Sequence, residues 1–283
     1  MTRIGFIGAG KVGFSLGRLM AARGLELSGY ASRTFASADD AARFTGSVAY
    51  PDAAGLVSSS DLVFLTVPDD AVLPVWQAIS GQGRASGKVV CHTSGFLSSE
   101  IFEGARAQGA YAASLHPLMA VPDRLESWEL LSEALYAAEG DPEALEVLGP
   151  VCDAMRVKYG VVDKAGKALY HCAASMVSNC AVALAFMGEG AFASLGLGGA
   201  LPGLWALMVR NAQSVAARGP EAALTGPVER ADTGTIKAHL DALSGDDREL
   251  YRRLCAKLVE LSRLKHPERD YGPLSGVLES YCV

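Results

Sequence analysis

The chain has 283 residues, of which 50% are hydrophobic and 20% charged, and its formal net charge is -6. This length exceeds the roughly 100–200 residues of a typical domain, so we expect two domains, and the apolar content excludes a disordered chain. The acidic balance and the dispersed lysines and arginines exclude nucleic acid as a partner. Six cysteines without CxxC spacing, and a start that lacks signal-peptide features, favour the cytoplasm.

From residue 3 to about residue 163, short apolar runs alternate with amphipathic stretches, which is typical of βα units on a parallel sheet. We predict an amphipathic helix beginning after Asp141-Pro142, because Asp is a good N-cap and Pro suits the first helical turn. Strands are predicted at residues 3–8, 25–31, 61–67, 88–92, 110–115, 134–140 and 157–163.

After residue 164 the strand pattern stops and apolar residues recur at helical spacing. The sequence therefore predicts an α/β protein: a doubly wound, mostly parallel Rossmann sheet over residues 1–163, then an all-α domain over residues 164–283.

The run over residues 168–187 is about as long as a membrane span of ~20 residues. It carries His171, Ser178 and Asn179 and lacks flanking basic anchors. We expect a helix buried between domains or subunits, and no membrane association.

The first predicted strand leads directly into Gly8-Ala9-Gly10-Lys11-Val12-Gly13, and an amphipathic stretch follows. In a GxGxxG turn between strand and helix, the glycines permit the tight turn, the approach of a pyrophosphate and the packing of helix on strand. The helix N-terminus then faces the phosphates. This setting predicts a dinucleotide site.

The second predicted strand ends in Ser32-Arg33-Thr34 and offers no carboxylate. An NAD-specific site would place an acid there to hold the ribose 2′-hydroxyl, whereas a hydroxyl and a guanidinium suit a 2′-phosphate. We expect NADP as cofactor, with NAD possible as the alternative. Arg33 could also be an ordinary solvated residue at a helix start.

Two further turns follow predicted strands, at Val67-Pro68-Asp69 and at Thr93-Ser94-Gly95. Ligands of open α/β sheets bind at the carboxyl ends of the strands, so these residues are predicted to line the nicotinamide side. Pro and Ser are also common in ordinary turns, and that interpretation stays open.

The sequence resembles a family of Rossmann-like oxidoreductases whose C-terminal half is the domain of unknown function numbered 2520. The resemblance covers nearly the whole chain. Besides the glycine motif it rests on LTVPDDAV, CHTSGFLSSE, SLHPL, KALYHCAASMVSN and ALTGPVERAD, at residues 65–72, 91–100, 114–118, 167–179 and 223–232.

The resemblance implies distant relation to pyrroline-5-carboxylate reductase, ketopantoate reductase, prephenate dehydrogenase and the β-hydroxyacid dehydrogenases. These place the substrate between a Rossmann domain and a helical, often dimerising domain of the 6-phosphogluconate dehydrogenase type. The β-hydroxyacid dehydrogenases use a Lys and an Asn four residues later, where this chain has Lys167 and His171. His116-Pro117 is similar to a His-Pro pair of prephenate dehydrogenases, although other features of that site are missing.

Hydride transfer needs a proton donor or a cation at the substrate oxygen or nitrogen, and Lys167, His171 and His116 are suitable types. Asn179 lies about two turns beyond His171 and is predicted on the same helical face. Each also has a structural interpretation, as a core histidine, a turn residue or a packing hydrogen bond. Arg230 could bind a substrate carboxylate or pair with a neighbouring acid. The Cys and His residues lack zinc-site spacing, so we expect no metal.

The leading hypothesis is an NADP-dependent oxidoreductase acting on a small keto acid or imine. The alternative is a non-catalytic dinucleotide sensor or scaffold, because a fold alone does not fix function. The apolar run between Ala168 and Val209 predicts a homodimer formed through the helical domain.

Overall fold

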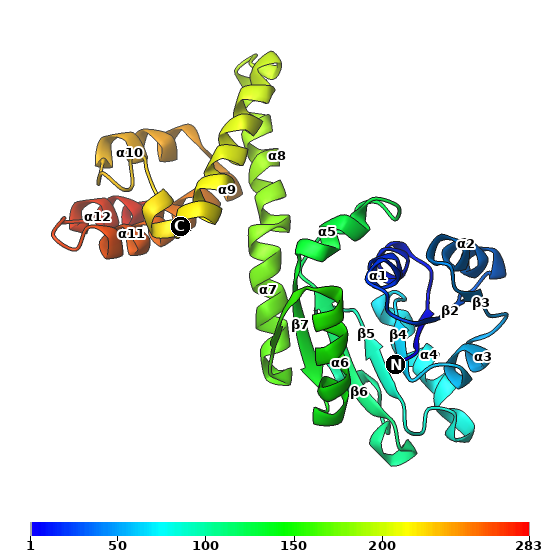
Figure 1. Ribbon diagram of the computed structural model, residues 1–283. Helices are drawn as coiled ribbons and strands as arrows, with labels where there is room; N and C mark the ends of the chain where they lie inside the picture. Colours follow the sequence, from blue (N-terminus) through cyan, green and yellow to red (C-terminus); the bar gives the residue numbers. More distant parts are fainter. Residues whose placement is uncertain (1, 283) are drawn as a thin grey trace. The chain divides into compact units, whose positions relative to one another are not determined.

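The computed structural model describes residues 2–282 and divides into two compact units, Met1–Val177 and Ser178–Val283. We describe each unit by itself. Figure 1 labels their helices and strands.

The first unit is built on an eight-stranded sheet in the order β3-β2-β1-β4-β5-β6-β7-β8. All neighbouring strands pair in parallel except β6 and β7, which are antiparallel. This confirms the mostly parallel sheet. The strands are β1 (Ile4–Ile7), β2 (Leu27–Ala31), β3 (Val48–Ala49), β4 (Leu62–Leu65), β5 (Val89–His92), β6 (Tyr111–Pro117), β7 (Leu135–Gly140) and β8 (Lys158–Val161).

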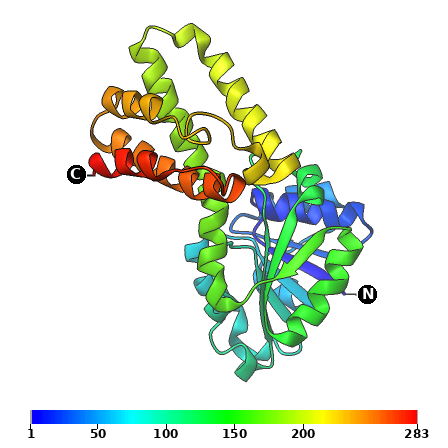
Figure 2. The ribbon, with the colours of Figure 1, turned by 90° about the vertical axis from the view of Figure 1, so that its left-hand side faces the viewer.

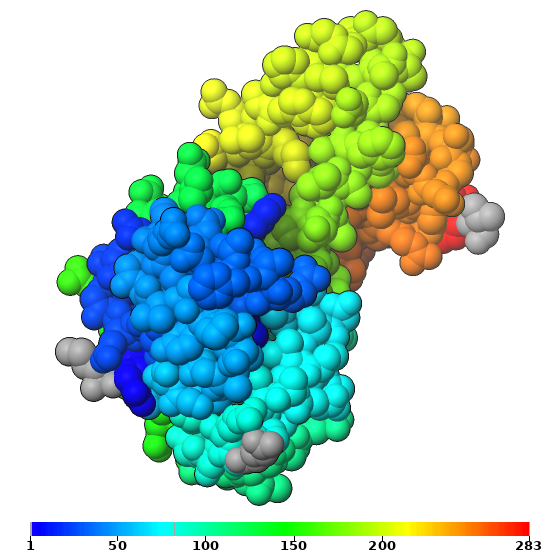
Figure 3. Space-filling view, turned by 90° about the vertical axis from the view of Figure 1, so that its right-hand side faces the viewer, coloured from blue at the N-terminus to red at the C-terminus, as the bar shows by residue number. Residues whose placement is uncertain are grey.

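Helices cover both faces of the sheet, which explains why β1, β4 and β5 are apolar runs buried throughout. On one face the core is formed with α1 (Lys11–Ala22), α2 (Phe35–Thr45), α5 (Ser127–Glu133) and α6 (Pro142–Met155). On the other face it is formed with α3 (Ala53–Ser58) and α4 (Asp69–Ser80). In Figure 3 the blue to cyan segments of this unit form one continuous surface.

The central strand order places the ligand site. The chain runs outward from β1 through β2 to β3 and then returns to β4 on the other side of β1. This reversal is the switch point at which open α/β sheets bind ligands, outside the carboxyl ends of the strands. The predicted glycine turn follows β1, so it lies at this point.

The first unit contains one strand and two helical segments beyond the elements predicted for the first domain. Strand β3 was not predicted because it is only two residues long. The compact unit continues past residue 163, the predicted domain end, through a short 3-10 turn at Lys164–Gly166 and α7 (Lys167–Val177). It does so because Lys167 is buried against β6 and the turn after β5.

As far as residue 282, the second unit consists of helices and the turns that connect them. It contains α8 (Asn179–Ser194), a short 3-10 turn at Gly198–Ala200, α9 (Leu201–Ala223), α10 (Thr233–Ala242), α11 (Gly245–Lys265) and α12 (Gly272–Ser280). Its core lies among α10, α11 and α12, around Ile236, Leu240, Val259 and Leu274. Figure 2 shows α8 and α9 as a helical hairpin.

The predicted helix over residues 168–187 forms as two helices, and its burial between domains or subunits stays a prediction. The helix is interrupted at Ser178, where φ is -108° and ψ is -76°, so that α7 ends and α8 begins there. Neither α8 nor α9 has a buried residue, and Val182 and Phe186 are 68% and 77% exposed. The helical stretch Lys164–Ser194 is long and apolar enough to cross a membrane, by length and composition only.

Candidate functional site

The glycine turn after β1 is held in shape by Thr66 at the end of β4. The Thr66 hydroxyl donates to the Gly8 carbonyl oxygen at 2.8 Å, and Gly8 has a φ of +112°. A Cβ on Gly13 would lie 2.3 Å from Thr66 Oγ1 and 2.5 Å from the Gly8 oxygen. Only glycine therefore lets α1 begin this close to the sheet, as the sequence motif requires.

Gly10 is the N-cap of α1 and supplies no side-chain hydrogen bond to the first turn. A Cβ there would meet nothing within 4 Å, so open space faces the turn. The first backbone N–H groups of α1 thus keep their capacity to donate to an anion, and the helix dipole adds to this preference.

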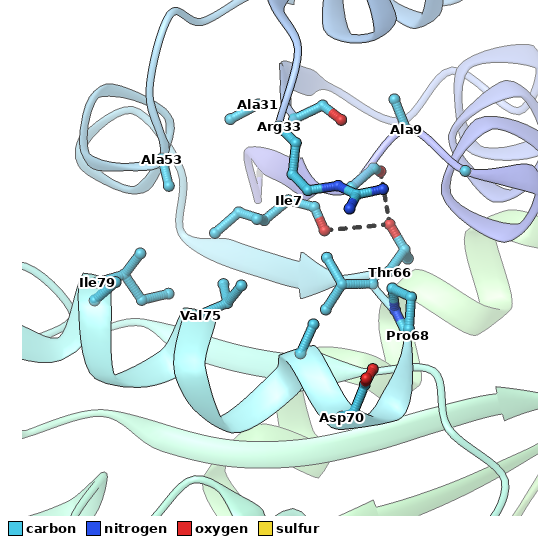
Figure 4. Close-up of a pocket in the computed structure, with 16 residues that line it drawn as sticks. Ile7, Ala9, Ala31, Arg33, Ala53, Thr66, Pro68, Asp70, Val75 and Ile79 are labelled. Carbon is cyan, nitrogen blue, oxygen red and sulfur yellow. Dashed lines mark hydrogen bonds between the residues drawn. The ribbon is translucent and has the colours of Figure 1, made fainter.

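A cavity of about 580 Å³ lies beside this turn (Figure 4). Its size is within the range of small-molecule and cofactor sites. One wall is apolar, made by side chains of α3 and α4. The cavity is lined by Ile7, Gly8, Ala9, Gly10, Ala31, Ser32, Arg33, Ala53, Thr66, Val67, Pro68, Asp70, Ala71, Val75, Ala78 and Ile79.

Seven predicted cofactor residues line this cavity: Gly8, Ala9, Gly10, Ser32, Arg33, Val67 and Pro68. The Arg33 side chain reaches from the end of β2 across the cavity toward Thr66 (Figure 4). Lys11, Val12, Gly13, Thr34, Thr93 and Ser94 are not among its lining residues.

These other predicted residues have different positions. Lys11 is the exposed first residue of α1, and Val12 follows it. Thr34 is the N-cap of α2, where its hydroxyl accepts from the Ser37 N–H. Thr93 and Ser94 belong to the turn after β5.

The Ser94 side chain connects the turn after β5 to the start of α4. Its hydroxyl donates to Asp69 Oδ2 at 2.8 Å and accepts from the N–H groups of Phe96 and Leu97. Asp69 follows Pro68, a lining residue of the cavity. The turn after β5 is thereby tied to the edge of the nucleotide cavity.

The His92 side chain makes hydrogen bonds to the backbone of the same turn. Its Nδ1 accepts from the Ser94 N–H at 3.2 Å, and its Nε2 lies 3.2 Å from the Ser98 carbonyl oxygen. This pair of contacts requires the neutral tautomer with hydrogen on Nε2. His92 is fully buried, and this burial lowers its pKa to about 4.

The turn carries Gly95 to a point between two histidines. A Cβ on Gly95 would lie 2.7 Å from His171 Cδ2 and 2.9 Å from His116 Nε2. The two imidazole centroids are 6.3 Å apart. The structure therefore brings together the predicted His116, at the end of β6, and His171, on α7.

His116 has a partner that the sequence analysis did not identify. Its Nδ1 lies 2.9 Å from the Tyr170 hydroxyl. Burial, with smaller effects from Lys167 and His171, lowers the pKa of His116 to about 4, while burial raises the pKa of Tyr170. At neutral pH both groups are uncharged, and each carries one transferable hydrogen.

Lys167 lies near these groups but is only 2% exposed. Its ammonium donates to the Ser94 carbonyl oxygen at 3.0 Å and to Ser114 Oγ at 2.6 Å. Burial lowers the pKa of Lys167, and the charge of Glu139 opposes this effect. The ammonium thus faces the sheet.

The remaining predicted residues lie in the second unit. Asn179 is an exposed residue at the start of α8, and its side chain bonds Ser178. Asn179 belongs to the second unit, whereas Lys167 and His171 belong to the first, so the predicted shared face stays a prediction. Arg230 is exposed, and its neighbour Asp232 caps α10 through the Thr235 N–H.

Sequence reasoning missed Glu139, Ser114, His92 and Tyr170 as parts of this cluster. Tyr170 precedes His171 in the predicted helix that became α7, and its hydroxyl could have been considered as a proton donor. The other three sit at paired positions of three adjacent strands, His92 opposite Ser114 and Ser114 opposite Glu139. Their shared face follows from strand register, which the sequence does not display.

Two family descriptions match the sequence. "Rossmann-like domain" matches residues 1–117, and "Domain of unknown function (DUF2520)" matches residues 134–258. The chain thus joins a Rossmann-like domain to a DUF2520 domain, as the sequence resemblance indicated. A search among curated proteins finds no match.

Several solved structures share the fold. Protein TM1727 from Thermotoga maritima is 27% identical, with a TM-score of 0.75 over 93% of this chain and 99% of that chain. BF3122 from Bacteroides fragilis, a proposed NADP oxidoreductase, is 22% identical, with a TM-score of 0.73 over 92% and 98%. A variant imine reductase from Myxococcus stipitatus, in complex with NAD+, is 18% identical, with a TM-score of 0.60 over 98% and 99%.

Proposed function

We propose that this protein is an NAD(P)-dependent oxidoreductase that prefers NADP and acts on a small keto acid or imine. The observation that carries this proposal is the Ser94–Asp69 hydrogen bond, which joins the edge of the nucleotide cavity to a turn flanked by His116 and His171. A dinucleotide site and a set of proton donors therefore occur in one compact unit. The fold shared with BF3122 and an imine reductase agrees with this assignment.

The cavity residues fit a dinucleotide phosphate. The free first turn of α1 suits the diphosphate, and the Ser32 hydroxyl with the Arg33 guanidinium suits a ribose 2′-phosphate. The apolar wall, which includes Val75 and Ile79, suits an adenine ring. No carboxylate among the described cavity residues comes from the end of β2, where an NAD-specific site places its acid.

When bound, NADPH supplies the hydride for reduction of a carbonyl or imine carbon. The protein must then protonate the oxygen or nitrogen. Neutral His116, with Nδ1 accepting from Tyr170, carries its hydrogen on Nε2, which lies on the side of the ring that faces Gly95. We assign proton donation to this pair, with His171 on the other side of Gly95 orienting the substrate.

The cofactor assignment is tested by calorimetric titration of NADPH and NADH into wild type and Arg33→Gln. Loss of a charge-assisted hydrogen bond of about 1.5–3 kcal/mol should weaken NADPH binding roughly 10- to 100-fold and leave NADH nearly unchanged. Arg23→Gln is a matched control, because Arg23 is an exposed arginine at the end of α1 and does not line the cavity. Equal losses for both nucleotides would contradict the role of Arg33.

The catalytic assignment is tested by following NADPH oxidation with a panel of keto acids and cyclic imines. Tyr170→Phe and His116→Ala should each lower kcat by roughly 100-fold or more, the usual contribution of a positioned proton donor, without weakening NADPH binding. Tight NADPH binding with no turnover of any compound would favour the sensor alternative.

We also propose that a second copy of the chain covers the apolar surface of α8 and α9. This surface includes Val182, Phe186 and Leu207, each more than half exposed, and Glu189 is the single charged residue of α8. An apolar surface of this kind marks an interaction site. We propose a cytoplasmic dimer rather than a membrane anchor, because a charged residue inside a membrane span is unfavourable and α8 carries Glu189.

Light scattering tests this assembly. Wild type should be a dimer at micromolar concentration, and Phe186→Glu should shift it toward monomer, because an unpaired charge in an apolar interface is strongly unfavourable. Leu264→Glu is the control, since Leu264 is a leucine on α11, outside this surface, and is 70% exposed. A wild-type monomer would overturn the proposal.

A further inference from the structure

A series of hydrogen-bonded, buried polar groups connects the turn after β5 to the sheet. Lys167 Nζ donates to Ser114 Oγ, and Ser114 Oγ donates in turn to Glu139 Oε2 at 3.3 Å. The Ser99 hydroxyl and the Ser99 N–H both donate to the Glu139 carboxylate at 2.7 Å. Lys167, Ser114, Glu139 and Ser99 are each at most 2% exposed.

Strand register explains why these groups meet. His92, Ser114 and Glu139 occupy paired positions on β5, β6 and β7, and paired residues project to the same face of a sheet. Ala112, two residues before Ser114, packs in the core formed with α3 and α4 on that face. A carboxylate there loses its hydration and needs both hydrogen-bond donors and an opposite charge.

Among the ionisable groups around Lys167, Glu139 is the one that supplies a buried negative charge. The other ionisable groups near Lys167 are Cys91 and His92 on β5, Asp69 on α4 and His116 on β6. Burial raises the pKa of the Cys91 thiol and lowers the pKa of both histidines to about 4, so these three are neutral at pH 7. Asp69 is an exposed residue. Glu139 is therefore the buried anion that faces Lys167.

We propose that Glu139 is a positioning residue: through the Ser114 hydroxyl it keeps the Lys167 ammonium charged and fixed against the Ser94 carbonyl. This contact sets the turn that carries Gly95 between His116 and His171. We call the hydrogen bond from the Lys167 ammonium to the Ser94 carbonyl oxygen the clamp. Glu139 keeps the ammonium of this clamp charged. The catalytic consequence rests on the proposed oxidoreductase function, but the clamp itself does not.

The test measures the ionisation of Lys167 directly, by the pH dependence of its 13Cε resonance in protein labelled with 13C-lysine and assigned with Lys167→Met. Glu139→Gln should move the midpoint to lower pH by about one to three units, the usual effect of a nearby opposite charge. Glu143→Gln is the matched control, because Glu143 is a partly exposed glutamate on α6 that pairs with Arg106. In this variant the Lys167 midpoint should equal that of wild type.

A second measurement follows the clamp itself. The Phe96 and Leu97 amides, which donate to Ser94 Oγ, should exchange hydrogen at least about tenfold faster in Glu139→Gln and in Ser114→Ala. An unchanged Lys167 midpoint in Glu139→Gln, or unchanged exchange in both variants, would overturn the proposal. Should Glu139→Gln not fold, exchange in Ser114→Ala decides.

Neither measurement uses bound cofactor or turnover, so failure of the proposed activity and failure of the clamp are distinguishable. If the protein is active, Glu139→Gln should lower kcat and change its pH profile with little change in NADPH affinity. Glu143→Gln should leave both unaltered.

Discussion

Acidification should destabilise this protein through His92. A histidine in an unfolded chain has a pKa near 6.5, whereas burial lowers the pKa of His92 in the fold to about 4. Between these values the unfolded state binds the proton and the folded state does not, so unfolding is favoured as pH falls. The stabilisation is complete above about pH 6.5 and is lost as the pH falls toward 4.

The size of this effect follows from the shift. Integrating the proton uptake of one group with these two pKa values gives a loss of about 2 kcal/mol between pH 7 and pH 5, and about 3 kcal/mol between pH 7 and pH 4. His116 should add a similar dependence, because burial lowers its pKa to about 4 as well. Losses of this size are a large part of the stability of a domain.

The measurement is urea denaturation of the full chain at pH 4 to 8, comparing wild type with His92→Gln. The glutamine amide keeps a donor for the Ser98 carbonyl oxygen but does not titrate, so the variant should lose about 2 kcal/mol less than wild type between pH 7 and pH 5. His239→Gln is the control, because His239 is an exposed histidine on α10. The same pH dependence in wild type and His92→Gln would refute this reasoning.

Two further predictions concern glycines at the site. Gly95→Ala should lower kcat by about 100-fold with little change in NADPH affinity, because its Cβ would lie under 3.0 Å from both histidines and displace them. The control is Gly166→Ala, whose Cβ would make an ordinary contact and which should retain activity. Equal activity of the two variants would contradict the role of Gly95. Gly13→Ala should weaken NADPH binding and lower the free energy of unfolding by about 1–3 kcal/mol, since its Cβ collides with Thr66. Gly10→Ala should weaken NADPH binding without lowering the free energy of unfolding, because its Cβ would meet no protein atom within 4 Å. Thermal melts and NADPH titrations of the Gly13 and Gly10 variants distinguish these effects. An equal loss of stability in both variants would contradict the contact assigned to Gly13.

The sheet and the nucleotide cavity could be predicted because their signals are local. Strands buried on both faces give continuous apolar runs, and the runs at 61–67 and 88–92 contain β4 and β5. The glycine turn is determined by close contacts with the adjacent strand β4, and only glycine satisfies them. Ser32 and Arg33 follow β2 directly, so their place at the carboxyl edge followed from the strand itself.

The charged cluster could not be predicted, because it depends on strand register. Glu139 lies in an apolar run followed by Gly140-Asp141, a pattern that also indicates a strand end before a turn. Only the antiparallel pairing of β6 with β7 places Glu139 beside Ser114. The spacing of Lys167 and His171 predicted a shared helical face but not which side chain would turn toward the sheet.

The direction of the Lys167 side chain limits its chemistry. To reach a substrate near Gly95, the ammonium would have to leave Ser114 and the Ser94 carbonyl, and Glu139 would remain buried without its counter-charge. Removing one partner from a buried charge pair costs about 3–5 kcal/mol, which would be added to the barrier of every turnover. Tyr170 and His116 already share a hydrogen bond beside Gly95 and are neutral at pH 7, so they can donate a proton without that rearrangement. We therefore infer that proton donation belongs to this pair and that Lys167 acts by holding the turn in place.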